Sequence, residues 1–226
     1  MKVTYYGHSC FAVQVGGSTL LFDPFISGNP LARNVEVNGI AADFILISHG
    51  HDDHMADAVA LAGRTRATII SNFELVEWFA GKGLTQGHAL NHGGAWQFPF
   101  GRVKFVTAIH SSSFPDGSYA GNPGGFVVES PQGNFYYSGD TALTLDMKLI
   151  GDSVPLAFAA LCIGDNFTMG VEDAIRASEF VRCNEILGVH YDTFPPIRID
   201  RHQAIEKFKA AGKNLRLLQP GESREF

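Results

Sequence analysis

The sequence predicts a globular fold of mixed α and β structure that is rich in strands in its first half. Among the 226 residues, 45% are apolar and 18% are charged, which is typical of a chain that buries a core. The 25 glycines indicate many tight turns. Apolar runs of strand length alternate with segments of helical pattern. The length suits one large domain, and we expect a single domain over residues 1–226.

The first quarter of the chain predicts mainly strands. The segments VTYYGHSCFAVQV and STLLFDPF are separated by Gly16 and Gly17, a turn typical of a β-hairpin. Residues 28–40 contain several Gly, Asn and Pro residues and predict a loop. DFILIS (43–48) predicts a buried strand, and MADAVALAG (55–63) predicts a helix with Gly63 as its C-cap.

Further along the chain, strands and helices are interspersed. ATIIS (67–71) predicts a strand, and Asn72 is a suitable N-cap for a helix in NFELVEWFAGKG. Two more helices are predicted in VEDAIRASEFVRC and RHQAIEKFKAAG. The remaining predicted strands are AWQFPF, RVKFVTAIH, GGFVVES, NFYYSGD, PLAFAALCIG, EILGVHY and LRLLQP.

Composition and charge argue against several classes of protein. The formal net charge is −6, and Lys and Arg form no basic cluster, so no nucleic-acid partner is expected. The longest nearly apolar run, VPLAFAALCIG, is too short to cross a bilayer, so no membrane partner is expected. Cys10, Cys162 and Cys183 are few, odd in number and far apart, which predicts buried free thiols and a cytoplasmic location. A small-molecule substrate is expected, and a homo-oligomer is compatible with the sequence.

One short segment concentrates residues that can bind metal ions. HGHDDH follows the predicted strand DFILIS and gives the pattern H-x-H-x-D-H, formed by His49, His51, Asp53 and His54. His49 and His51 lie two residues apart, so in an extended loop they point the same way and can chelate one ion. Asp53 and His54 stand at the entry to a predicted helix and can face a second ion. Imidazole and carboxylate together suit Zn²⁺ and similar divalent metals.

Three further residues of the same kinds follow predicted strands. His110 closes RVKFVTAIH, Asp140 follows NFYYSG, and His190 closes EILGVH. Each of them alone would be more typical of a structural residue. Strand ends in open α/β sheets are places where loops converge and ligands bind. Because all three occur in order downstream of H-x-H-x-D-H, they predict additional metal ligands.

This ordered set resembles the metallo-β-lactamase superfamily over essentially the whole chain. More narrowly, GHSCF, DNFTMG and HYDTFPPI resemble the UPF0173 metal-dependent hydrolases, a group related to the ascorbate-6-phosphate lactonases. The resemblance implies an α+β fold, an αββα sandwich of two mixed β-sheets flanked by helices, with a binuclear metal site at one edge. The residues that match its motifs are Asp23 in LLFDPF, His49, His51, Asp53, His54, His110, Asp140 and His190.

The resemblance also implies how two divalent ions would be held. His49, His51 and His110 would bind the first ion. Asp53, His54 and His190 would bind the second, and Asp140 would bridge both. Asp23 would orient ligands from behind the site, because ligating imidazoles usually donate their other N–H to an acceptor; otherwise it is a turn residue before Pro24. Zinc is the expected metal, and Mn²⁺, Fe²⁺ and Ni²⁺ are compatible with the same ligands.

The expected enzyme is a metal-dependent hydrolase of a small lactone, ester or phosphodiester. Two ions about 3.5–4 Å apart can share a water and lower its pKa towards 7. Asp53 is the expected catalytic residue, since it can hold or accept the proton of that water. Two alternatives stay open: a metal-dependent phosphodiesterase or nuclease, and a mononuclear iron dioxygenase of the same fold. The intact ligand set argues against metal binding without catalysis.

Other polar residues fall on loops that could line the pocket. His8 in YYGHSC could face the metals or cap a turn. Cys162 lies within an apolar strand and has no His beside it in sequence, so it is not expected to act as a nucleophile. His88, His92 and His202 are expected at structural or surface positions. The candidates for substrate contacts are His8, Asn166, Thr168, Met169, Asp192, Thr193 and Ser111–Ser113.

Overall fold

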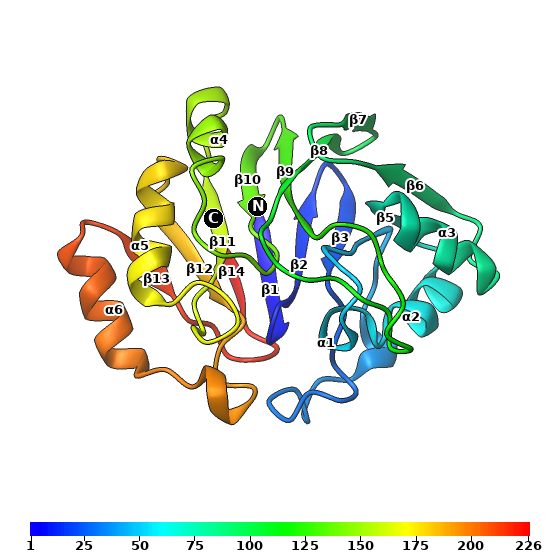
Figure 1. Cartoon of the computed structure of the whole chain (residues 1–226), viewed down its shortest axis with the longest axis horizontal. Helices are drawn as coiled ribbons and strands as arrows, with labels where there is room; N and C mark the ends of the chain where they lie inside the picture. Colours follow the sequence, from blue (N-terminus) through cyan, green and yellow to red (C-terminus); the bar gives the residue numbers. More distant parts are fainter.

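Two seven-stranded sheets pack face to face in the computed structural model, which describes residues 1–226 (Figure 1). The first sheet has the spatial order β14 (Ser223–Glu225), β1 (Lys2–Gly7), β2 (Cys10–Val15), β3 (Ser18–Phe22), β4 (Phe44–Leu46), β5 (Thr68–Asn72) and β6 (Gly87–Leu90). The second sheet has the order β7 (Ala95–Phe98), β8 (Gly101–Thr107), β9 (Gly124–Ser130), β10 (Gly133–Tyr137), β11 (Phe158–Cys162), β12 (Glu185–Val189) and β13 (Asn214–Arg216).

Helices cover the outer face of each sheet. Figure 1 shows one group of helices on the right of the sheets and the other group on the left. The first group is α1 (Asp52–Met55), α2 (Ala58–Thr65) and α3 (Phe73–Gly81), and the second is α4 (Met147–Ser153), α5 (Val171–Phe180) and α6 (Arg201–Ala210). Two short 3₁₀ turns, Val37–Gly39 and Pro195–Ile197, lie in loops. The predicted αββα sandwich is therefore confirmed.

Three hydrophobic clusters hold the four layers together. The cluster between the sheets contains 23 buried residues, among them Phe11 and Phe22, whose rings stack with centroids 4.6 Å apart. A second cluster of 19 residues joins the first sheet to its helices, and a third of 18 residues joins the second sheet to its own. β11 is buried at all five positions, as its continuous apolar run predicts for a strand covered on both faces.

The helix predicted from residue 55 to Gly63 differs in the structure. It is divided into α1 and α2 at Asp57, whose carboxylate accepts hydrogen bonds from the backbone N–H groups of Ile26 and Ser27. Gly63 lies inside α2, and the helix ends at Arg66, which takes the left-handed C-cap conformation (φ +59°). The expectation of a C-cap at Gly63 was wrong, because the buried face of the helix includes Leu61 and Ala62 and the chain turns only after them.

Three short elements were not predicted from the sequence: β6, β14 and α4. β6 and β14 have only four and three residues, which is too few to give a readable period of two. α4 contains Gly151, which the sequence pattern favours as a turn residue. In the structure, a Cβ atom at Gly151 would lie 2.3 Å from the carbonyl oxygen of Phe180, so glycine allows α4 to approach the end of α5.

The strand directions bring the carboxyl ends of several strands of each sheet to one edge of the sandwich. In the first sheet, β1 and β3 each pair antiparallel with β2, and β4 is parallel to β3. In the second sheet, β8 and β10 each pair antiparallel with β9, and β11 and β12 continue parallel to β10. β1, β3 and β4 therefore end on the same side of the first sheet, and β8, β10, β11 and β12 end on the same side of the second. The segments after β4, β8, β10 and β12 carry the predicted metal ligands.

Candidate metal centre

The structure brings the seven predicted ligands together between the two sheets. His49 and His51 follow β4, and Asp53 and His54 lie in α1. The donor atoms of His49, His51 and His110 lie within 4.8 Å of one another. Those of Asp53, His54 and His190 form a second such group, which also includes His8. These two groups have the same membership as the two ligand sets that the sequence resemblance implies, with His8 added to the second.

Asp140 lies between the two groups. Its Oδ2 atom is 2.9 Å from His190 Nε2, 3.3 Å from His54 Nε2 and 3.6 Å from His110 Nε2. Its Oδ1 atom is buried and has no hydrogen-bond partner. One carboxylate thus faces histidines of both groups, which is the arrangement that a bridging ligand requires.

Asp23, at the end of β3, is a fully buried acceptor for several donors. Its Oδ1 atom accepts from the backbone N–H of Ser48 at 2.7 Å. Its Oδ2 atom accepts from His54 Nδ1 at 2.7 Å and from the Tyr137 hydroxyl at 2.6 Å, and also from the Ser48 hydroxyl. Because a carboxylate only accepts, His54 carries its hydrogen on Nδ1 and turns Nε2 towards the ligand cluster.

Ser48 orients His49 in the same way. The Ser48 hydroxyl donates to Asp23, so it accepts the hydrogen of His49 Nδ1 at 2.9 Å. The Nε2 atom of His49 is then free of hydrogen and lies 2.9 Å from Nδ1 of His51. Two imidazole nitrogens at this distance converge on one point, as ligands of a single ion do.

Several buried donor atoms fit bound cations. His54 Nε2, Asp140 Oδ1 and His190 Nδ1 are buried and lack hydrogen-bond partners. Buried polar atoms without partners are uncommon in folded proteins and call for an explanation. Two of these atoms, His54 Nε2 and Asp140 Oδ1, belong to side chains that are predicted metal ligands. Divalent ions bound by these side chains would supply the missing partners. The mixed imidazole and carboxylate donor set suits zinc and similar metals.

The charges of the cluster are strongly coupled. Burial alone would lower the pKa of His54, but the carboxylates of Asp140, Asp53 and Asp23 together raise it well above its ordinary value. Burial would raise the pKa of Asp140, but His190 and His54 hold it well below its ordinary value. Burial and the nearby His54 lower the pKa of His49. The carboxylates of this cluster therefore favour positive charge, which protons or metal ions can supply.

Backbone strain is concentrated at the same edge. His8, Asp23 and His190 have positive φ angles of 55°, 39° and 56°. This left-handed region is uncommon for residues other than glycine, although Asp and His enter it more readily than most. Sparsely populated backbone conformations tend to gather at functional sites. Each of these three residues directly follows a strand, so the strain turns its side chain out of the strand and into the site.

The predicted substrate contacts have different environments. His8 is fully buried beside Asp53, and Thr193 is buried with its Oγ1 atom 2.8 Å from His8 Nδ1. Asp192 is engaged within its own loop, where it accepts from the backbone N–H of Ile199 at 3.0 Å and lies 3.6 Å from Arg201 Nε. Asn166 is exposed, and the hydroxyl of Thr168 donates to the carbonyl of Met169. Of these five candidates, His8 and Thr193 are the ones that contact the ligand cluster or its neighbours.

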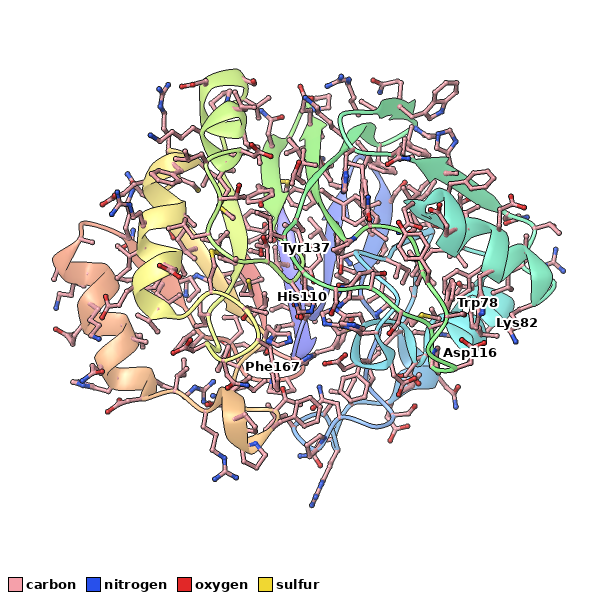
Figure 2. The ribbon with its side chains drawn as sticks, in the orientation of Figure 1. Trp78, Lys82, His110, Asp116, Tyr137 and Phe167 are labelled. Carbon is pink, nitrogen blue, oxygen red and sulfur yellow. The ribbon has the colours of Figure 1, made fainter.

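The loop after His110 closes one side of the site. Ser111 Oγ lies 3.3 Å from His51 Nε2, and Ser112 accepts from the backbone N–H of Gly50. Figure 2 labels His110 and Tyr137 near the middle of the molecule. His51, Asp53 and His110 are half-buried, whereas the other predicted ligands are buried, so the half-buried three mark the open side.

Sequence reasoning missed several residues that support the site. The hydroxyls of Ser48 and Tyr137 donate to Asp23. The Thr141 hydroxyl accepts from the backbone N–H of Ile109, the residue before His110. The one available signal was position, since Ser48 directly precedes the H-x-H-x-D-H pattern. His88 and His202 are partly or fully exposed, and His92 Nε2 donates to the carbonyl of Pro123 at 2.8 Å, as expected for residues outside the site.

The three cysteines are free and buried, which confirms that part of the sequence prediction. Burial raises the pKa of the Cys162 thiol to about 11, so it is protonated at neutral pH and unsuited to act as a nucleophile. None of the helices combines the length and the apolar character that crossing a bilayer requires.

Comparisons with known proteins agree with this fold and site. A model of the beta-lactamase superfamily domain matches residues 2–190. A UPF0173 metal-dependent hydrolase of Flavobacterium johnsoniae is 54% identical over 100% of both chains, and one of Methylacidiphilum infernorum is 52% identical over 99% of both. The solved structure of Igni18, a metallo hydrolase of the archaeon Ignicoccus hospitalis, has a TM-score of 0.89 at 34% identity and covers 100% of this chain and 98% of that one.

The chain therefore belongs to the metallo-β-lactamase superfamily and, within it, to the family of UPF0173 metal-dependent hydrolases. Both levels of the resemblance seen in the sequence motifs are confirmed.

Proposed function

We propose that the chain is a hydrolase that uses two divalent ions, with zinc as the expected metal, to cleave a small lactone, ester or phosphodiester. The observation that carries the proposal is the pair of ligand groups joined by Asp140, whose Oδ2 atom faces histidines of both. A mononuclear site, as in an iron dioxygenase, would need only one of these groups. Bound there, two ions would supply hydroxide at neutral pH and polarise the oxygen of the substrate.

The residues of the chain divide the work. His49, His51 and His110 would hold one ion, and Asp53, His54 and His190 the other. Asp23 fixes the tautomer of His54, and through Ser48 it also fixes that of His49. These ligands need no rearrangement to present their lone pairs, so the site is organised in advance.

Asp53 is the residue that we propose to hold and accept a proton of the attacking water. It is half-buried, and its Oδ1 atom lies 4.0 Å from His54 Nε2 on the side of the ligand cluster. The nearby histidines His54 and His8 lower its pKa against the effect of burial, so it is ionised at neutral pH. An ionised carboxylate at the open side of the site can accept a hydrogen bond from the attacking water and orient it.

The surroundings of the open side favour a substrate with an apolar part. Ile109 and Phe167 are 54% and 57% exposed. The backbone N–H of Ile109 donates to the Thr141 hydroxyl, and Met169, two residues after Phe167, donates to the Thr141 carbonyl. Both apolar side chains thus stand on segments fixed to the residue that follows Asp140. We propose that they contact an apolar group next to the bond that is cleaved.

Activity measurements test the proposal directly. The metal-loaded protein is assayed against lactones, phosphodiesters, thioesters and β-lactams, and we expect turnover of at least one lactone or phosphodiester. His51→Ala removes a ligand of the first ion and is expected to lower kcat/KM by at least about 100-fold while the circular dichroism spectrum is unchanged. His202→Ala, which changes an exposed histidine of α6, is the matched control. Equal activity of the two variants would reject the site assignment.

A further inference from the structure

His8 is a buried histidine that neither ligand set requires. It follows β1 directly, and its side chain is fully inaccessible to solvent. Its backbone carbonyl accepts from the Tyr5 hydroxyl at 3.0 Å and from the N–H of His190 at 2.9 Å. The backbone of His8 is therefore fixed by contacts from β1 and from the end of β12. A buried imidazole held in this way, next to the ligand cluster, needs a functional explanation.

Both ring nitrogens of His8 are engaged. Nε2 lies 3.1 Å from Asp53 Oδ2, and Nδ1 lies 2.8 Å from Thr193 Oγ1. The Asp53 carboxylate can only accept, so the hydrogen is on Nε2. Nδ1 then accepts from the Thr193 hydroxyl. A neutral imidazole in this tautomer satisfies both contacts. The Asp53 carboxylate selects the tautomer, because the Thr193 hydroxyl, which also lies 3.3 Å from the Tyr191 carbonyl, can donate or accept.

We propose that His8 is a positioning residue that fixes the rotamer of the Asp53 carboxylate. By holding Oδ2, His8 leaves Oδ1 for the ion shared with His54 and His190. Asp53 makes no other side-chain hydrogen bond to a protein donor, and it stands on the half-buried side of the site. Without His8, its carboxylate would be free to rotate towards solvent. This role rests on the proposed function, because it concerns the second ion of the same centre.

The other possible role of His8 is that of a fourth ligand, since its donor atom falls within the second group. The hydrogen-bond pattern favours the positioning role. Neither nitrogen of His8 is without a partner, whereas His54 Nε2 and Asp140 Oδ1 are buried and unpartnered. A histidine whose Nε2 already donates to Asp53 has no lone pair to offer at that atom.

The test compares His8→Gln with His8→Leu. The two side chains are similar in size and both are unbranched at Cβ, so the positive φ at residue 8 affects them alike. The amide of Gln can donate to Asp53, and Leu cannot. Thr193→Val keeps His8 and removes the hydroxyl at Nδ1, and it serves as a second variant if His8→Leu does not fold. Thr65→Val, which removes a hydroxyl bound to Leu61 O in α2, is the matched control.

The readout is titration of the metal-free protein with Co²⁺, followed by visible absorption and elemental analysis. Asp53→Ala identifies the ion that Asp53 helps to hold. For that ion, we expect the dissociation constant to rise about 10–100-fold in His8→Leu and by a smaller factor in Thr193→Val. In His8→Gln it should stay within about fivefold of the wild-type value. In Thr65→Val it should be unchanged. The visible absorption spectrum at saturation with Co²⁺ should be the same in these four variants.

Two results would overturn the proposal. An unchanged dissociation constant in both His8→Leu and Thr193→Val would mean that His8 does not position Asp53. Loss of one ion, or an altered saturated spectrum in His8→Leu, would make His8 a ligand. The proposed function is judged separately by the activity of the wild-type protein: if it hydrolyses none of the substrates while the Co²⁺ affinities change as expected, the hydrolase proposal fails and the positioning role stands.

Discussion

At the scale of single residues, Asp23 shows how a buried carboxylate can orient predicted metal ligands, directly for His54 and through Ser48 for His49. Its two oxygens accept from Ser48, His54 and Tyr137, and all three contacts are buried. Hydrogen bonds to an ionised acceptor in such surroundings are stronger than those between neutral groups. Each donor that is removed leaves part of this charge unsatisfied, so the stability of the fold should depend on each of them.

Two neighbouring tyrosines of β10 allow this dependence to be measured. Tyr137→Phe removes a donor to Asp23 and is expected to lower the free energy of unfolding by about 1.5–3 kcal/mol. Tyr136 points to the other face of the sheet, and its buried hydroxyl has no partner, so Tyr136→Phe should change the free energy by less than about 0.5 kcal/mol or raise it. Urea denaturation of the metal-free protein measures both. Equal losses of unfolding free energy in the two variants would contradict the stabilising role of the hydrogen bond between Tyr137 and Asp23.

At the scale of elements, the loop of residues 111–123 is held against α3 at two places. Phe114 stacks on Trp78 with ring centroids 5.1 Å apart. Asn72, the N-cap of α3, accepts from Leu75 N–H through Oδ1 and donates through Nδ2 to the carbonyls of Ala120 and Asn122. Figure 2 labels Trp78, Lys82 and Asp116 together at one side of the molecule. The loop that follows His110 is thus anchored to α3 through residues outside the predicted ligand set.

Asn72→Asp separates the two roles of this side chain. The carboxylate still caps α3, but it cannot donate to the carbonyls of Ala120 and Asn122. We expect amide hydrogen exchange in residues 111–123 to become about tenfold faster, while exchange in α3 is unchanged. The control is Asp200→Asn at the N-cap of α6, where the side chain accepts from Gln203 N–H and touches no such loop. Faster exchange of α3 itself would show that the cap had been lost.

The sequence predicts the local parts of the site and misses the parts that depend on strand pairing. Four of the seven predicted ligands lie within H-x-H-x-D-H, where spacing alone predicts metal binding. The contact between Tyr137 and Asp23 joins residues 114 positions apart, and no local pattern marks either residue as a partner of the other. The same holds for His8 and Asp53, which are 45 positions apart. α4 was missed because Gly151 is explained only by the helix packed against it.

At the scale of the whole molecule, the candidate metal centre joins the two sheets. His49, His51, Asp53 and His54 extend from the first sheet, and His110, Asp140 and His190 from the second. Only the folded chain brings the complete set together, because the predicted ligands are spread over residues 49–190. Bound metal should therefore stabilise the packing of one sheet on the other.

Metal removal tests this coupling. We expect elemental analysis to give two ions per chain, and chelation to lower the melting temperature. At a free metal concentration of 100 times the dissociation constant, each ion should contribute about 2.7 kcal/mol to the free energy of unfolding. His51→Ala should show a smaller chelation effect, whereas His202→Ala should behave like the wild type. Zero or one ion per chain with all ligands intact would count against a binuclear centre.

The two sheets also repeat the same order of strand pairings. Each sheet consists of four strands joined by antiparallel pairings and then three more added in parallel, so β14 and β1–β6 correspond one by one to β7–β13. The sequence has no visible repeat, but this correspondence is what duplication of an ancestral half would leave. In it, His8 after β1 is the counterpart of His110 after β8, and Asp23 after β3 is the counterpart of Asp140 after β10. One copy of each pair would then have become a metal ligand, and the other its support.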